Sequence, residues 1–222
     1  MQRWQLYAVT VALLWTSPPS QHRYLGGLGE GPIRQAAGRN EALRAELERM
    51  LEDDQTLRSQ ADEVEKKYGS KSKELEELWA RQTVNDKKNL SRLEEMIKEN
   101  GWPGLSSVGG KASLAAFLIL QHADYEHQKK YFPLVKEALK KGEIEASNVA
   151  LLEDRILVRE GKEQIYGTQL KTNESTGKLE LSPIKDEENV DKRRKAVGLP
   201  PIAEYLKMFG LQYVPPSKKQ QR

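Results

Sequence analysis

Two long stretches in the first half of the chain have apolar residues every three or four positions, the spacing that places them on one helix face. In residues 40–68 they are Leu43, Leu47, Met50, Leu51, Leu57, Ala61 and Val64. In residues 72–100 they are Leu75, Leu78, Trp79, Leu90, Leu93 and Ile97. Asn40 is a suitable N-cap, and Gly69 and Gly101 follow the two stretches. We expect two helices that pack as an antiparallel hairpin.

The most apolar internal segment is ASLAAFLILQ, residues 112–121. It predicts a buried helix that packs on the hairpin and runs to about Lys141, with a kink or restart at Pro133. Residues 101–110 read as a rigid loop, and residues 147–160 as a further helix. Alternation of apolar and polar residues in 163–171 and 178–185 predicts a β-hairpin around the turn 172–177. Two short helices are expected over 191–197 and 201–209.

The predicted fold class is therefore mainly α, a helical bundle with a long N-terminal helical hairpin and one small β-hairpin. We expect a single helical domain over residues 40–213 and a basic tail over 214–222. The apolar stripes of the two long helices need a partner, since burying one leucine side chain contributes about 2 kcal/mol.

The N-terminal segment has the layout of a secretory signal. Arg3 precedes an apolar run from Trp4 to Trp15, and Pro18 and Pro19 follow it. We expect residues 1–20 to be a signal peptide or membrane anchor and residues 21–39 to be a linker. The protein would then be secreted or periplasmic, with the N-terminal segment in contact with the membrane. The alternative is an apolar helix that packs on the domain.

Composition excludes several classes of function. The formal net charge is only +3, which argues against a general nucleic-acid binder. The basic run from Lys192 to Lys195 follows four acidic residues, so it is expected to form a solvated helix face. There is no cysteine and there are only three histidines, which excludes disulfides, thiol nucleophiles and cysteine-ligated zinc. The glycine-rich segment 104–113 lacks the spacing of a phosphate loop. We predict no cofactor and no metal.

Candidate chemistry lies just after the apolar segment, in the run from His122 to Gln128. A histidine beside a carboxylate exchanges protons near neutral pH and can act as a general acid or base. We predict His122 and Asp124 as such a catalytic pair. The alternative is structural: His122 bonds a backbone carbonyl and the acidic side chains face water.

Other polar side chains are candidates for substrate binding. They share hydrogen-bonding groups suited to a polar or anionic ligand: Arg58, Gln128, Asp154, Arg155, Gln164, Tyr166, Thr168 and Gln169. Asp54 and Arg58, four residues apart, can instead form a surface ion pair, and the run 164–169 can instead be a hairpin with a solvated face. We expect His122, Asp124, Arg155 and Tyr166 to meet in one cluster, because a buried carboxylate needs a partner such as arginine.

Six motifs in order resemble those of a bacterial domain-of-unknown-function family. They read Asp54-Gln55 with Arg58; Gly101-Trp102-Pro103 with Val108-Gly109; Gln121-His122-Ala123-Asp124; Asp154-Arg155; Gln164 to Gln169 as QIYGTQ; and Val190-Asp191 with Arg193-Arg194, leading to Val197-Gly198-Leu199-Pro200 and Glu204-Tyr205. The resemblance covers residues 40–210 and implies no particular activity. It implies a shared polar site, because packing alone does not call for this set of side chains.

The sequence thus favours an exported enzyme, a hydrolase or a transferase, with a His–Asp acid–base pair in a polar pocket. Two alternatives stay open: a non-catalytic module that binds a small ligand or peptide, and a structural domain with a protein-interaction surface. The expected partner is a polar or anionic small molecule or peptide, and not a nucleic acid.

Overall fold

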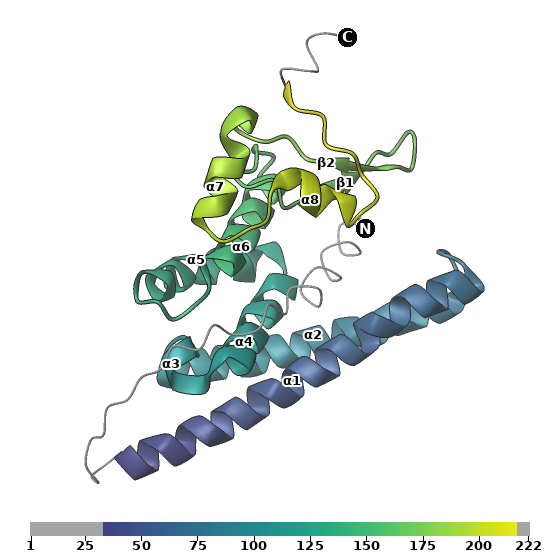
Figure 1. Cartoon of the computed structure of the whole chain (residues 1–222). Coiled ribbons are helices and arrows are strands. Elements are labelled where there is room, and N and C mark those ends of the chain that lie inside the picture. The colour runs from purple at the N-terminus through teal and green to yellow at the C-terminus, as the bar shows by residue number, and fades with distance from the viewer. Residues whose placement is uncertain (1–32, 217–222) are drawn as a thin grey trace. The chain divides into compact units, whose positions relative to one another are not determined.

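The computed structural model describes residues 33–216 (Figure 1). Helices dominate this part of the chain and a single two-stranded hairpin accompanies them, which confirms the mainly α fold class. The predicted signal or anchor segment, residues 1–20, lies outside the described residues. So do residues 21–32 of the predicted linker and the last six residues of the predicted tail.

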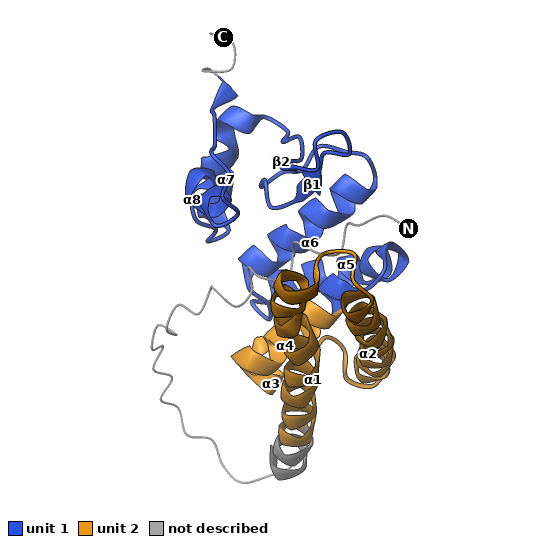
Figure 2. Ribbon diagram, turned by 90° about the vertical axis from the view of Figure 1, so that its right-hand side faces the viewer, with its two compact units in different colours: residues 1–5, 120–222 blue, residues 6–119 orange. Residues whose placement is uncertain are grey.

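The described residues fall into two compact units, coloured separately in Figure 2. Unit 2 extends to Ile119 and unit 1 begins at Leu120. The division lies within one continuous helix, α4 (Gly110–His122). A single domain over residues 40–213 stays a prediction.

Two long helices form a hairpin in unit 2. α1 (Ile33–Tyr68) ends at Gly69, whose φ of 93° suits glycine, and α2 (Lys73–Asn100) begins after Ser72. The Ser72 side chain caps α2 by accepting a hydrogen bond from the backbone N–H of Leu75. α1 begins earlier than predicted, so residues 33–39 of the predicted linker are helical.

The apolar stripes of the hairpin include fully buried residues, while others such as Leu57 and Trp79 are half-buried. Leu47 on α1 and Leu93 on α2 are both fully shielded from solvent. At this level Arg92 on α2 donates to Glu46 on α1, with an Nε–Oε1 distance of 2.6 Å. The pair fixes the antiparallel register, and the buried leucines supply the free energy of association.

The loop after α2 contains an unpredicted helical turn, α3 (Leu105–Val108). Gly109, with a φ of 80°, ends it directly before α4. α4 is apolar on all sides, as its sequence predicts, and residues such as Phe117 and Leu120 are buried. Near its start, the Lys111 ammonium lies 3.0 Å from a carboxylate oxygen of Glu52 on α1.

α4 ends at His122, which corrects the prediction of one helix to about Lys141. α5 (Tyr125–Lys140) is a separate helix capped by Asp124, whose carboxylate accepts from the backbone N–H of His127. Pro133 lies inside α5 without ending it. Because proline has no N–H, the carbonyl of Lys129 lacks a donor within the helix. Pro133 is exposed, so this carbonyl lies close to solvent.

The rest of unit 1 holds short elements. α6 (Ala146–Arg159) agrees with its prediction. The hairpin strands β1 (Leu170–Thr172) and β2 (Leu179–Leu181) pair antiparallel, with Leu170 opposite Leu181. They are shorter than predicted, because residues 165–168 form a loop instead. The 3-10 turn η1 (Glu187–Asn189), α7 (Val190–Ala196) and α8 (Ile202–Lys207) complete the unit.

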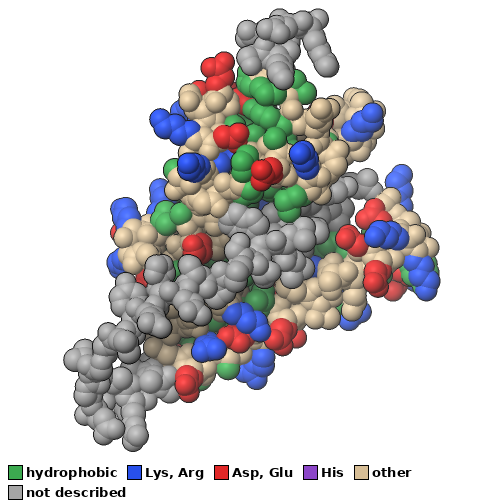
Figure 3. Space-filling view, in the orientation of Figure 1, with side chains coloured by type: hydrophobic (Ala, Val, Ile, Leu, Met, Phe, Trp, Pro, Cys, Tyr) green, Lys and Arg blue, Asp and Glu red, His purple; other side chains and the backbone are tan. Residues whose placement is uncertain are grey.

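Two surface properties follow from these elements. Acidic and basic side chains are interspersed on the face shown in Figure 3, which agrees with the small net charge. Within residues 33–216, no helix combines the length and the apolar character needed to cross a membrane.

Candidate functional site

A cluster of polar side chains interrupts the apolar interior of the α1–α2 hairpin. Asp54 and Arg58 lie one turn apart on α1, and the Arg58 Nε donates to Asp54 Oδ1 at 3.0 Å. The Arg58 Nη2 donates across the hairpin to Asp86 Oδ1 on α2 at 2.5 Å. Asp54 and Arg58 are both buried, so their pairing is confirmed but the expected surface location is wrong. One arginine thus holds two carboxylates.

Two glutamine side chains also bond these carboxylates. Gln82 on α2 is 1% exposed, and its amide Nε2 donates to Asp54 Oδ1 at 3.1 Å and to Asp86 Oδ1 at 2.7 Å. The Gln55 Nε2 donates to the other oxygen, Asp54 Oδ2, at 2.7 Å. With both aspartates ionised and Arg58 protonated, these groups carry a net charge of −1, which the two amides stabilise without neutralising.

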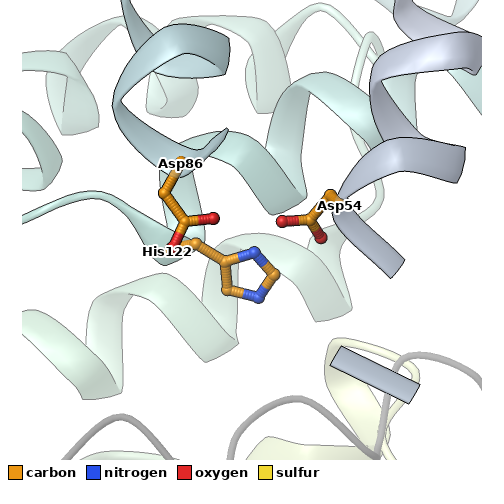
Figure 4. Close-up of side chains that lie close together, drawn as sticks. All are labelled: Asp54, Asp86 and His122. Atoms are coloured by element: carbon orange, nitrogen blue, oxygen red, sulfur yellow. The ribbon is translucent and has the colours of Figure 1, made fainter. Parts of the chain in front are cut away.

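His122 lies beside the two carboxylates (Figure 4). It is the last residue of α4, the continuous helix that begins in unit 2 with Gly110. One ring nitrogen of His122 and one carboxylate oxygen each of Asp54 and Asp86 all lie within 4.8 Å of one another. A histidine that exchanges protons is therefore placed next to a cluster with a net charge of −1.

The same three residues are of types that can hold a divalent metal ion. At least three of their four carboxylate oxygens, however, already accept hydrogen bonds from other side chains. Asp54 uses Oδ1 for Arg58 and Gln82 and Oδ2 for Gln55, and Asp86 uses Oδ1 for Arg58 and Gln82. The Arg58 guanidinium supplies the positive charge that a metal would bring.

Asp124, the predicted partner of His122, has another role. Its Oδ1 accepts from the backbone N–H of His127 at 3.0 Å and lies 2.8 Å from the Nδ1 of the same residue. Burial opposes ionisation, but the hydrogen bonds from His127 prevail and hold the pKa of Asp124 below its usual value. The structure places the carboxylates of Asp54 and Asp86 close to the His122 ring. The pairing of His122 with Asp124 stays a prediction.

A second polar network lies wholly within unit 1 and is centred on Asp154 of α6. This carboxylate is fully buried and accepts from the backbone N–H of Ile165 at 2.6 Å, of Tyr166 at 3.0 Å and of Thr168 at 3.0 Å, and from the Thr168 hydroxyl at 3.0 Å. Burial raises the pKa of Asp154, and these four donors act in the opposite direction. The predicted strand over 165–168 is a loop because its amides turn inward to this carboxylate.

The glutamines of the same motif hold the loop at its two ends. Gln164 donates to the carbonyls of Gln169 at 3.0 Å and Ser182 at 2.7 Å, and accepts from the Gln169 N–H at 2.8 Å. Between them Gly167 has a φ of 69°, and a Cβ at this position would lie 2.6 Å from Ile202 Cδ1. These contacts account for Gln164, Thr168 and Gln169 as parts of the fold.

Arg194 was expected on a solvated helix face but is fully buried. It donates through Nε to the carbonyl of Pro200 and through Nη1 to that of Tyr166, both at 2.6 Å. Its guanidinium lies 4.8 Å from the ring centroid of Tyr205, and the Tyr205 hydroxyl donates to the Thr168 carbonyl at 2.7 Å. Arg155 is also buried, and its charge acts on the Tyr205 hydroxyl.

Gln128 connects the end of α4 with α5. Its amide Nε2 donates to the carbonyls of Gln121 at 2.8 Å and Ala123 at 3.1 Å, and its Oε1 accepts from Arg159 at 3.1 Å. The predicted site residues are thus distributed: Arg58 lies with Asp54 and Asp86, and Asp154, Tyr166 and Thr168 lie together in unit 1. A meeting of His122 and Asp124 with Arg155 and Tyr166 stays a prediction.

Sequence reasoning missed Gln82 and Asp86. A signal for them exists: the apolar stripe of α2 pauses between Trp79 and Leu90. At the positions where the stripe would continue, the chain has Gln82, Asn85, Asp86 and Asn89. Polar residues at core spacing on an otherwise apolar face indicate a buried polar site.

Comparison with protein families finds that residues 41–215 match the family of unknown function DUF6624, and the chain belongs to this family. No curated protein and no solved structure matches the chain.

The first prediction concerns Asp154→Asn. The new amide places an NH2 group against backbone N–H donors, so we expect a loss of about 3 kcal/mol in the free energy of unfolding. Urea denaturation followed by circular dichroism measures it. Glu163→Gln, an exposed carboxylate near the same loop, is the control and should change stability little. Equal stabilities of the two variants would contradict the assigned role of Asp154.

The second prediction concerns Glu160. Lys162 and the Tyr125 hydroxyl bond this carboxylate, and Lys129 lies 3.4 Å from it; together they lower its pKa to about 2. In the folded protein its pKa lies below 4.5, the ordinary value of a glutamate side chain. The carboxylate therefore stabilises the fold above pH 4.5, and this contribution disappears as the pH falls through 2. A carbon-detected NMR titration should show Glu160 still ionised at pH 3; protonation near pH 4.5 would contradict the contacts.

Proposed function

We propose that this member of the DUF6624 family is an enzyme, a hydrolase or a transferase, in which His122 transfers a proton. One observation carries the proposal. A histidine ring nitrogen and the carboxylate oxygens of Asp54 and Asp86 lie within 4.8 Å of one another, in a cluster where one arginine balances only one of two negative charges.

The charge balance supports a proton-transfer role. With His122 neutral the cluster carries −1, and with His122 protonated it carries zero. Both states have small charge, so the ring can take up and release a proton without leaving a large unbalanced charge near the protein interior. General acid–base catalysis by a positioned histidine contributes about 10²- to 10⁴-fold to a rate. Arg58 and Gln82 keep the carboxylates fixed and so position the charge that acts on His122.

The chemistry of the cluster favours transfer of a proton between His122 and either water or a second substrate. Its side chains are carboxylate, guanidinium, amide and imidazole groups, and the chain has no cysteine. None of these groups is a hydroxyl or thiol nucleophile. A histidine base that activates water gives a hydrolase, and one that activates an acceptor hydroxyl or amine gives a transferase.

His122→Gln tests this proposal. We expect it to reduce turnover about 100-fold or more on those members of a panel of chromogenic esters, phosphoesters and glycosides that the wild-type chain cleaves, with an unchanged melting temperature. His127→Gln replaces an equally half-buried histidine outside the cluster and should keep full activity. Loss of activity in both variants, or in neither, would overturn the assignment of His122.

A histidine-selective NMR titration of the wild-type chain supplies a second readout. The His122 ring should change protonation between pH 5 and 9, as a general acid or base must. A ring that keeps one protonation state across this range contradicts the proposal. Stoichiometric binding of Zn²⁺ or Mn²⁺ that restores the activity of a chelator-treated protein would identify a metal centre instead.

We also propose that the chain is exported, cleaved or retained as a membrane anchor. The support is the sequence alone: Arg3, the apolar run from Trp4 to Trp15, and the prolines after it. Residues 1–25 fused to a reporter enzyme active only outside the cytoplasm should give activity. The same fusion with Leu13→Asp and Leu14→Asp should be inactive. Equal activity of the two fusions would refute the export signal.

A further inference from the structure

The polar residues on the inner face of α2 form a stripe about two turns long. Gln82, Asn85, Asp86 and Asn89 share one helix face, because their spacing is three or four residues. From Gln82 to Asn89 the helix rises about 10 Å. Buried apolar residues lie on both sides of the stripe: Leu75 and Leu78 before it, and Leu90 and Leu93 after it.

Four amide atoms at this stripe are shielded from solvent and have no hydrogen-bond partner in the described part of the chain. They are Oε1 of Gln55, Oε1 of Gln82, Nδ2 of Asn85 and Nδ2 of Asn89. Gln82 is 1% exposed and Asn89 is 4% exposed. Buried polar groups in proteins are normally bonded, because desolvation without a partner opposes folding. Four such atoms along one stretch of the hairpin therefore call for hydrogen-bond partners from outside the chain.

The orientation of two of these amides is determined by the carboxylates. The NH2 groups of Gln82 and Gln55 face Asp54, and that of Gln82 also faces Asp86. Turning either amide around would place its oxygen against a carboxylate. Their Oε1 atoms are therefore acceptors that need a donor. One and two turns along α2, Asn85 and Asn89 present donors that need an acceptor.

These requirements define the chemical class of the ligand. An anion would satisfy only the asparagine donors, and a cation only the glutamine acceptors. Arg58 is already engaged by both aspartates, so it offers no free cation to an anionic group. A hydroxyl donates one hydrogen bond, accepts two, and rotates to suit its surroundings. Several hydroxyls along about 10 Å match both kinds of amide atom.

We infer that this stripe, Gln55 on α1 with Gln82, Asn85 and Asn89 on α2, binds a neutral ligand rich in hydroxyl groups, a sugar or polyol. The inference rests on the proposed function, since it names the substrate class of the same centre. A hydroxyl bound to the Gln82 Oε1 would contact the side chain that bonds both carboxylates of the centre, and His122 is the group of that centre that would exchange a proton.

The test observes the side-chain amides directly in the full-length chain. In a ¹⁵N-labelled sample, glucose, ribose, N-acetylglucosamine or inositol should shift the NH2 signals of Gln82, Asn85 and Asn89. The signal of Gln60, which is exposed on α1, should not move. Inorganic phosphate and N-methylacetamide serve as the anionic and amide probes. If none of the hydroxylated compounds shifts the stripe, or only phosphate or N-methylacetamide does, the inference is overturned.

Asn89→Leu gives the matched variant. Leucine continues the apolar stripe, so the variant should keep or exceed the wild-type melting temperature while sugar binding weakens at least tenfold. Gln60→Leu is the control and should bind as the wild type does. If Asn89→Leu unfolds the chain, Asn85→Leu replaces it, and the same weakening is required. Unchanged sugar binding in a folded stripe variant overturns the inference.

His122→Gln separates this inference from the proposed function. Sugar binding that survives in this variant while turnover is lost supports both. Sugar binding by a wild-type chain whose His122 ring never changes protonation supports the ligand class and removes the catalytic role. Turnover of non-hydroxylated esters without any sugar binding removes the ligand class and leaves the catalytic role standing.

Discussion

The hydrogen bonds from Arg58 to Asp54 and Asp86 are the interaction on which the polar centre of the hairpin depends. Two carboxylates on facing helices repel each other, and burial increases that repulsion. A guanidinium that bonds both of them turns the repulsion into a cross-link between α1 and α2. Gln82 supports the same geometry from the second helix. Removal of Arg58 would leave the buried Asp54 and the half-buried Asp86 without a cation, which makes this residue difficult to replace.

The two buried carboxylate systems of this protein are satisfied in different ways. Asp154 is held mainly by backbone N–H groups of one loop, which it shapes. Asp54 is held by side chains from two helices, and its cluster includes a histidine that can change charge. A carboxylate bonded by backbone amides has little freedom to take part in a reaction. A side-chain cluster with an incomplete charge balance can exchange a proton.

The helices could be predicted because apolar spacing reports directly on burial: Leu47 and Leu93 are the stripe residues that the core encloses. The points where helices and strands end were harder to predict. Asp124 starts a new helix with its own carboxylate, a local hydrogen bond that competes with helix continuation, whereas Pro133 is accommodated. Residues 165–168 alternate like a strand, yet their amides bond Asp154, eleven or more positions earlier in the chain. The order of apolar and polar residues over a few positions gives no information on a hydrogen-bond partner that lies so far away in the chain.

The same limit explains why the sequence predicts only part of the candidate site. His122 could be selected from the sequence because it follows a buried helix, but its carboxylate neighbours belong to other helices, and the nearest acid in the chain, Asp124, was chosen instead. The register of the hairpin brings Asp54 opposite Gln82, and Arg58 reaches Asp86. That register depends on the leucines at both ends and on Glu46 with Arg92. Polar residues at core spacing within such a hairpin reduce its apolar contact, so the flanking leucines must supply the packing that the polar centre does not.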